Sequence, residues 1–166
     1  MIAFTYLKGK LNTSQSDADS LFSKGFGEKV GSVIEFSVFD ILFLLERNKC
    51  EVFFKKKRLS FVDFFKKSKV LHVEYVVYAN LRDKGYLIKS GLKYGTAFRV
   101  YDKGAKIGDE HASWLVEPVT STLKTSYKQL AGMNRVAHST HKKLLFAIVD
   151  AESQVTYLEM HWVRML

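Results

Sequence analysis

The spacing of apolar residues predicts the helices of this chain. Apolar side chains recur three and four residues apart in several segments, which predicts helices over residues 38–46, 61–69, 74–83 and 134–147. Ser37 precedes the first segment and is suited to be its N-cap. Ser60 and Asp63 have the spacing of a capping box at the start of the second. These local signals fix where two of the helices should begin.

Strand-like runs separate the helices. Alternating or β-favouring residues lie at 1–7, 50–54, 86–89, 95–101, 114–116, 145–149 and 155–163. Pro118, the single proline, is expected to close the strand that begins at Trp114. In 95–101 the alternation places Arg99 and Tyr101 together on the polar face. The segment 9–20 is polar and rich in turn residues, so it is predicted to be a loop.

The pattern changes near residue 70 and divides the chain in two. Residues 1–70 form a small N-terminal α+β domain in this interpretation, and residues 71–166 form a C-terminal domain. In the second part strand and helix signals alternate, which favours a mixed sheet flanked by helices. The predicted fold class is therefore α/β, or α+β, in two small domains.

Composition and charge narrow the function classes. Apolar residues make up 47% of the chain and glycine and proline are few, which excludes a disordered protein. The net charge of +9 favours a polyanionic partner, nucleic acid first and an anionic membrane surface second. The phenylalanines between 36 and 65 follow helix and strand spacing, so they are expected in the core and not on a base-stacking surface.

Cysteine and histidine usage argues against a metal or disulfide framework. Cys50 is the only cysteine, which excludes an internal disulfide and a thiolate zinc cluster and suggests a reducing compartment. His72 and His161 have no partners at the spacing of a metal site. With no apolar run long enough for a membrane span, the chain is expected to be cytoplasmic, with no membrane partner and no cofactor.

The second part of the chain carries ordered motifs. These are Tyr78-x-x-Leu-Arg-Asp-Lys-Gly-Tyr86, Lys89-x-Gly-Leu-Lys-Tyr-Gly-x-x-Phe-Arg-Val-Tyr101, His111 and Arg135-Val-Ala-His-Ser-x-x-Lys142. In type and spacing they resemble the catalytic domain of the archaeal tRNA-splicing endonucleases. The resemblance implies a restriction-nuclease-like core and a metal-independent RNA endonuclease. It would cut precursor tRNA in a bulge-helix-bulge fold and leave 2′,3′-cyclic phosphate and 5′-hydroxyl ends.

The resemblance also implies roles for particular residues. Tyr101, His111 and Lys142 match the catalytic triad of the family. Arg135 and the near-terminal Arg164 match arginines that hold a bulge base. The family further docks an acidic loop into a neighbouring subunit, and the matching loop here carries Asp150 and Glu152.

The residue types suit that chemistry on their own terms. Cleavage of RNA by its own 2′-hydroxyl needs a base, an acid for the departing 5′-oxygen and positive charge on the phosphorane. Lys142 is a suitable cation, and an imidazole such as His111 titrates near working pH. Tyr101 is a poor base at neutral pH unless a cation such as Arg99 or Lys142 stabilises its phenolate.

One face of the helix predicted over 134–147 would carry Arg135, His138 and Lys142. His138 is expected to pack or to form hydrogen bonds beside the site and not to act as the acid. Two other functions stay open: a non-catalytic subunit of the same enzyme, and a basic RNA-binding module without chemistry.

The expected assembly is a homotetramer, or a heterotetramer with a catalytically silent subunit. One triad per chain and two scissile bonds per substrate require at least a dimer. An aromatic-rich edge strand at 155–163 would also need to be covered.

Overall fold

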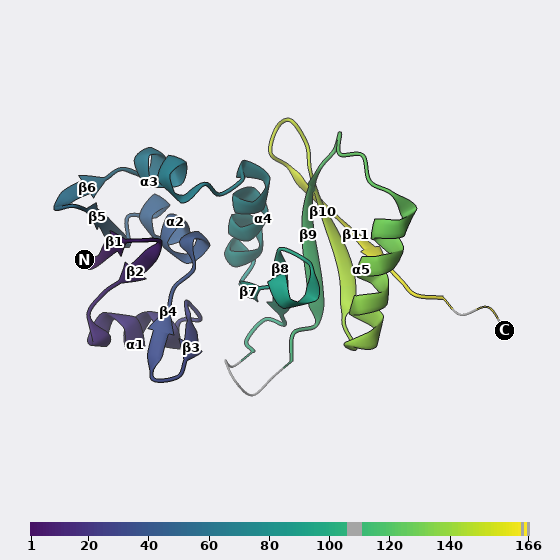
Figure 1. Cartoon of the computed structure of the whole chain (residues 1–166), viewed down its shortest axis with the longest axis horizontal. Helices are drawn as coiled ribbons and strands as arrows, with labels where there is room; N and C mark the ends of the chain where they lie inside the picture. Colours follow the sequence, from purple (N-terminus) through teal and green to yellow (C-terminus); the bar gives the residue numbers. More distant parts are fainter. Residues whose placement is uncertain (106–110, 164, 166) are drawn as a thin grey trace. The chain divides into compact units, whose positions relative to one another are not determined.

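The computed structural model describes residues 1–105, 111–163 and 165 (Figure 1). The chain divides into two units, Met1–Leu71 and His72–Leu166. Each unit combines helices with its own sheet, so the predicted mixed α+β class is confirmed. None of the helices that the structure describes has the length and apolar character needed to traverse a lipid bilayer.

The first unit contains a four-stranded sheet in the order β2-β1-β5-β6. Its strands are β1 (Ile2–Leu7), β2 (Lys10–Asn12), β5 (Cys50–Phe54) and β6 (Lys57–Leu59). The central strands β1 and β5 are parallel, and each continues into an antiparallel hairpin with its outer neighbour. The unit is completed by α1 (Gln15–Ser23), α2 (Val38–Glu46), α3 (Phe61–Ser68) and the hairpin of β3 (Glu28–Val30) and β4 (Val33–Glu35).

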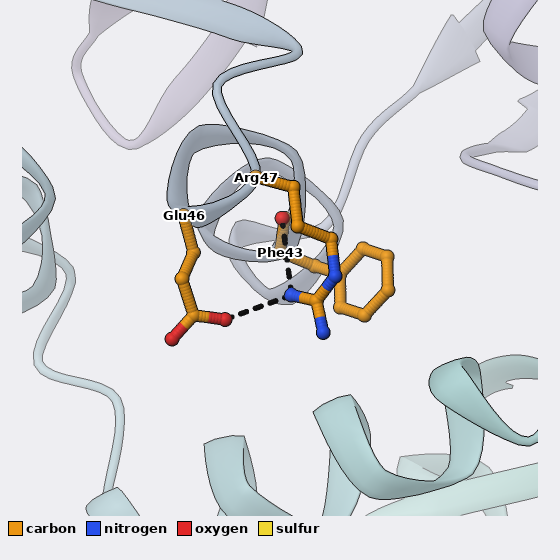
Figure 2. Close-up of polar contacts among 3 residues, drawn as sticks. All are labelled: Phe43, Glu46 and Arg47. Atoms are coloured by element: carbon orange, nitrogen blue, oxygen red, sulfur yellow. Dashed lines mark hydrogen bonds and ion pairs between the residues drawn. The ribbon is translucent and has the colours of Figure 1, made fainter.

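The start of α2 confirms the N-cap predicted from the sequence. The Ser37 hydroxyl accepts a hydrogen bond from the Asp40 N–H at 3.1 Å, and the Asp40 carboxylate accepts from the Ser37 N–H at 3.0 Å. At the other end Arg47 closes the helix (Figure 2). Its guanidinium lies 3.6 Å from the Phe43 ring centroid and donates to Glu46 at 2.7 Å. An apolar helix of nine residues thus has polar groups satisfied at both ends.

The loop predicted over residues 9–20 was wrong. This segment contains β2 and the first part of α1. Ser14 is the N-cap of α1, and its hydroxyl accepts from the Asp17 N–H at 3.2 Å. Only Ala18 and Leu21 of this helix are buried, so its apolar stripe is too narrow to show the helical spacing of apolar residues in the sequence.

The second unit contains a five-stranded mixed sheet in the order β11-β10-β9-β8-β7. The strands are β7 (Leu87–Ser90), β8 (Phe98–Tyr101), β9 (Trp114–Thr120), β10 (Lys143–Val149) and β11 (Val155–Met160). β9 and β10 pair in parallel, and the other neighbouring strands pair antiparallel. Among the described residues, β11 is hydrogen-bonded to β10 alone and is an edge strand.

Two helices cover opposite faces of this sheet (Figure 1). In α4 (His72–Asp83), Tyr78 packs against Phe98 of β8 with ring centroids 5.9 Å apart. In α5 (Tyr127–Ser139), Ala137 packs into a buried cluster with Leu115 and Leu144. Because side chains alternate along a strand, Phe98 and the row that contains Leu115 and Leu144 lie on opposite faces.

Three sequence-based boundaries in this unit were wrong. The strand at 114–116 continues through Pro118 to Thr120, because β8 pairs with β9 only as far as Val116 and leaves an open side where a proline is tolerated. The helix predicted over 134–147 instead spans Tyr127–Ser139, and residues 143–149 form β10. The last strand ends at Met160 and not at residue 163.

Candidate active site

Three chain segments meet at one end of the second sheet, where β8 stops and β9 and β10 start; this end is called the sheet edge below. β8 runs antiparallel to β9 and β9 runs parallel to β10, so the end of β8 lies beside the starts of β9 and β10. Val100, Trp114 and Lys143 form one row across these strands. Beyond it, the Ser113 N–H donates to the Val100 carbonyl and the Ser113 carbonyl accepts from the Lys143 N–H, both at 3.0 Å.

All three predicted catalytic residues belong to these segments. Tyr101 is the last residue of β8, and Lys142 immediately precedes β10. His111 precedes β9 by three residues and is exposed. The fold therefore places these three residues on chain segments that meet at one sheet edge.

The polar face of β8 contributes Arg99 together with Tyr101. The Arg99 guanidinium lies 5.9 Å from the centroid of the Tyr101 ring. Arg99 pairs with Leu115 in the row that faces α5, so both side chains of the polar face lie on the α5 side of the sheet. Just after Tyr101, Asp102 accepts a hydrogen bond of 2.5 Å from the Ser113 hydroxyl. This bond ties the end of β8 to the segment that leads into β9.

Lys142 does not lie on the helix that the sequence predicted. The helix α5 ends at Ser139, and His141 adopts a left-handed conformation with φ of 54°. The Lys142 N–H then donates to the Ala137 carbonyl at 2.8 Å, which closes the helix C-terminus. Consequently Lys142 does not share a helix face with Arg135 and His138, and its position is set by the turn into β10.

The Lys142 ammonium group is held on two sides. It donates to the Thr140 carbonyl at 3.0 Å, and its Nζ lies 5.2 Å from the centroid of the Tyr94 ring. The side chain is half-buried. Both contacts restrict where the ammonium group can lie. A cation that stabilises a reacting phosphate must be held in position in this way.

Tyr94 is a member of this site that sequence reasoning missed. It ends the short 3₁₀ helix η1 (Leu92–Tyr94) and packs against the buried cluster between α5 and the sheet. Two glycines fix its place. A Cβ on Gly91 would lie 2.7 Å from the carbonyl carbon of Phe98, and Gly95 has φ of +75°. The Gly-Leu-Lys-Tyr-Gly motif is therefore the local requirement for placing Tyr94 under Lys142.

Positive charges surround the Tyr94 phenol. Burial raises its pKa. A hydrogen bond from Lys93 and the charges of Lys142, Lys93 and Arg99 lower that pKa more, so the net shift is downward from the usual value of 10.0. A site that lowers the pKa of a phenol also favours other negative charge, including a phosphate.

Comparisons with known proteins agree with this arrangement. A family model for the catalytic C-terminal domain of tRNA intron endonuclease matches residues 71–157. The chain is 37% identical to a tRNA-splicing endonuclease of Thermococcus gammatolerans, over 99% of both chains. It is 37% identical to the tRNA-splicing endonuclease of Pyrococcus furiosus, over 86% of this chain and 84% of that one. It is 31% identical to that of Methanothermobacter thermautotrophicus, over 84% and 83%.

This chain belongs to the tRNA-splicing endonuclease family. The family model covers α4, β7 to β10, α5 and the start of β11, and it therefore includes the sheet edge that carries Tyr101, His111 and Lys142. The relatives extend the match through the first unit as well. The resemblance stated from the motifs is thus confirmed at the level of the family.

Two arginines were predicted to hold RNA in a member of this family. Arg135 lies exposed on α5, and Arg164 lies outside the described residues. One turn after Arg135, the His138 ring stacks on Trp162 with centroids 5.5 Å apart and planes 9° apart. This stack brings the segment after β11 to the C-terminal end of α5, on the side of the helix that carries Arg135.

The two acidic residues predicted for subunit assembly lie in the turn between β10 and β11, and both are exposed. Asp150 also has a local role. Its carboxylate accepts from the N–H groups of Glu152 at 3.1 Å and Gln154 at 2.8 Å. Glu152 enters these bonds through its backbone and not through its carboxylate, so its side chain is the better one to alter in an assembly test.

Residues that could bind a metal do not cluster in the described part of the chain. Over residues 1–105 and 111–163, no group of three or more His, Cys, Asp or Glu side chains is placed to hold an ion. Cys50 is buried in β5 of the first unit.

Proposed function

We propose that this chain is a tRNA-splicing endonuclease that cuts precursor tRNA at intron boundaries within a bulge-helix-bulge fold. The observation that carries this proposal is the sheet edge at which the end of β8 and the starts of β9 and β10 meet. Tyr101, His111 and Lys142 all belong to that edge, in a chain whose relatives are tRNA-splicing endonucleases over nearly their full length.

In the proposed reaction the substrate supplies the nucleophile. Tyr101 takes the proton of the 2′-hydroxyl, whose oxygen attacks the adjacent phosphorus. His111 protonates the departing 5′-oxygen, and Lys142 stabilises the charge on the phosphorane. The products are a 2′,3′-cyclic phosphate and a 5′-hydroxyl. Each group needed for this reaction comes from a side chain or from the RNA, so we propose that it requires no metal.

The surroundings of Lys142 support its role. An ammonium group has three N–H donors, and the Thr140 carbonyl accepts one of them. The remaining donors can reach phosphate oxygens. The Tyr94 ring supports the ammonium group from a second direction, so Tyr94 is a positioning residue in this mechanism.

Recognition of the bulge is assigned to the end of α5 and the segment after β11. We propose that Arg135 and Arg164 hold an extruded base between their guanidinium planes. The stack of His138 on Trp162 supports this placement for Arg135, because it brings the segment after β11 to the side of α5 on which Arg135 lies.

We further propose that the active form is an oligomer, either a homotetramer or a heterotetramer with a silent subunit. β11 has an open edge among the described residues, and Leu158, Trp162 and Val163 nearby are 55%, 45% and 73% exposed. An apolar strand edge of this kind is usually covered by another chain. Two symmetric sites would then cut the two boundaries of one intron. With a precursor tRNA as substrate, the cytoplasm is the expected location.

The proposal is tested by incubating the purified full chain with a bulge-helix-bulge RNA in excess EDTA. We expect two cuts at fixed positions, one in each bulge, and cyclic phosphate on each upstream fragment. Absence of cleavage in EDTA with full recovery in magnesium would overturn the metal-independent mechanism. Absence of cleavage under both conditions, with retained RNA binding, would favour a non-catalytic subunit.

A further inference from the structure

The first unit carries much of the positive charge of the chain in one short stretch. Residues 50–69 include seven lysines and arginines but only two carboxylates, a net charge of +5 out of +9 for the whole chain. Asp63 lies close enough to Lys57 and Lys66 to interact with their charges, so the two carboxylates offset part of the positive charge and leave the rest. Glu51 pairs with Arg58 at 3.1 Å, and the Asp63 carboxylate accepts hydrogen bonds from the N–H and hydroxyl of Ser60 at the start of α3.

The topology gathers these charges at one end of the first sheet. β1 and β5 are parallel neighbours, and each turns back through a two-residue turn, at Lys8-Gly9 and at Lys55-Lys56. Both turns therefore lie at the same end of the sheet. Six exposed lysines at this end are here named the basic edge: Lys8, Lys10, Lys55, Lys56, Lys57 and Lys67.

One aromatic ring draws lysines from two elements together. The Nζ atoms of Lys67 in α3 and Lys55 in the turn lie 3.8 Å and 5.6 Å from the centroid of the Phe54 ring. Because both ammonium groups contact this one half-buried ring, positive charge from two elements is concentrated at the same end of the sheet, which favours an anion there.

The backbone of the β5–β6 turn gives an independent reason to suspect function. Both turn residues are left-handed, with φ of 49° at Lys55 and 66° at Lys56. Such a turn strongly favours Asn-Gly, and lysine is a poor choice at both positions. The neighbouring turn has the same conformation but uses Gly9 at its second position. The chain thus keeps two lysines where the backbone favours asparagine and glycine, and residues held in sparsely populated backbone conformations are common at functional positions.

We propose that the basic edge binds the sugar–phosphate backbone of paired RNA in the substrate, independently of sequence and of bulges. This inference rests on the proposed function for the identity of the polyanion. Lysine ammonium groups are flexible point charges that suit phosphate contacts without reading bases. The basic edge would therefore add affinity for the body of the RNA and would not affect the chemical step.

The test uses the full chain with Lys55→Asn and Lys56→Gly together. These changes remove two charges and introduce the residues that the turn prefers, so the melting temperature is expected to stay level or rise. Binding to a fully paired RNA hairpin without bulges is measured as a function of salt. We expect weaker binding and a salt slope smaller by about 2, one for each phosphate that the variant no longer neutralises.

A matched control removes two charges elsewhere in the same unit. Lys29→Gln with Lys49→Gln alters two exposed lysines, and Lys49 precedes β5 at the opposite end of the sheet. This variant should keep the parent affinity and salt slope. Cys50 reports on the fold of both variants, because burial, with a smaller effect of Glu51, raises its pKa to about 12 and it should stay unreactive to iodoacetamide.

Other outcomes would overturn the inference. Equal losses in the two variants would show attraction by net charge alone. Loss of binding to phosphatidylserine vesicles with unchanged RNA binding would assign the edge to a membrane, and a change of oligomeric mass with unchanged RNA binding would assign it to a protein contact. Cleavage of bulged RNA by the parent is scored separately. If the parent fails to cleave but the two variants still differ in duplex binding, the proposed function fails and the basic edge stands.

Discussion

The turn from α5 to β10 and the turn from β5 to β6 both combine lysine with left-handed backbone, but they leave the lysine side chains in different surroundings. In the turn from α5 to β10, His141 is left-handed and Lys142 is half-buried, bonded to the Thr140 carbonyl and set over the Tyr94 ring. In the turn from β5 to β6, Lys55 and Lys56 are themselves left-handed and exposed. The first turn fixes one charge in one place, and the second displays several charges to solvent.

The difference corresponds to two ways in which a lysine charge of the protein can act on RNA. A charge that stabilises a transition state must be held in position before the reaction begins, because its interaction is strongest in that state. A charge that adds affinity for a polyanion gains little from being fixed, because phosphates recur along the whole duplex. The comparison therefore predicts that changes in the two turns will affect different kinetic quantities.

The largest expected effect comes from Lys142→Ala. Loss of a preorganised charge should lower the single-turnover cleavage rate about 10²-fold or more, with little change in RNA affinity. The double variant Lys55→Asn with Lys56→Gly should show the opposite pattern, weaker binding with an unchanged rate at saturating protein. Rapid-quench cleavage and filter binding measure both quantities. If both variants changed the cleavage rate and the RNA affinity in the same way, the two turns would not have different roles.

A third charged turn, between β10 and β11, extends the comparison to assembly. Glu152→Lys reverses the charge at residue 152, and Asp150→Asn removes a second charge while keeping an oxygen that can accept the hydrogen bonds of the turn. Light scattering should show dimers in place of the larger assembly, and cleavage should fall by roughly tenfold as the assembled form is lost. Glu28→Lys, which reverses one charge in the hairpin of β3 and β4, is the control. Unchanged mass and activity in the double variant would contradict the assembly proposal.

A smaller effect is expected at Tyr94. Replacing the ring by Tyr94→Leu removes a cation–π contact worth about 1 kcal/mol, so the cleavage rate should fall about fivefold with unchanged RNA affinity. Tyr94→Phe keeps the ring face and should restore most of that rate. If phenylalanine and leucine at this position gave equal rates, the ring would not be what positions Lys142.

The smallest effect is spectroscopic. Because the pKa of Tyr94 is lowered, its phenolate should form at a lower pH than that of an ordinary tyrosine in an alkaline titration followed by ultraviolet absorbance, and this early phase should be missing in Tyr94→Phe. Lys93→Gln should move the phase to higher pH. The folded phenol ionises before the unfolded one, so Tyr94 adds stability as pH rises through its folded pKa and loses that contribution as pH falls below it. An early phase that survives in Tyr94→Phe would assign the shift to another tyrosine.

The sequence predicted what depends on short-range hydrogen bonds. The capping pairs Ser37–Asp40 and Ser60–Asp63 lie within four residues, and both helices begin where the sequence placed them. The prediction of the boundary between α5 and β10 was wrong because residues 144–149 are apolar at every position, a pattern that suits a buried helix and a buried strand alike. Pairing with β9, which the local pattern does not contain, decides the outcome.

In the candidate site, too, contacts between residues distant in the sequence could not be predicted. The motifs pointed to Tyr101, His111 and Lys142, and the fold brings their segments to one edge. Tyr94 lay inside a quoted motif but received no role, because its contact with Lys142 joins residues far apart in the sequence. The signal that could have found it was the pair of glycines around it, since Gly91 lets the backbone approach β8 closely and Gly95 adopts a left-handed conformation.

Tyr101→Phe is the most direct test of whether the sheet edge of the second unit cuts RNA. This change removes one oxygen from the last residue of β8 and keeps the ring beside Arg99. Tyr127→Phe, at a residue that is 90% exposed in α5, is the matched control. In single-turnover cleavage of a bulge-helix-bulge RNA in EDTA, we expect the Tyr101 variant to be slower by about 10² or more and the Tyr127 variant to match the parent. A Tyr101 variant that cleaves at the parent rate would show that Tyr101 is not the base and that this sheet edge does not cut RNA as proposed.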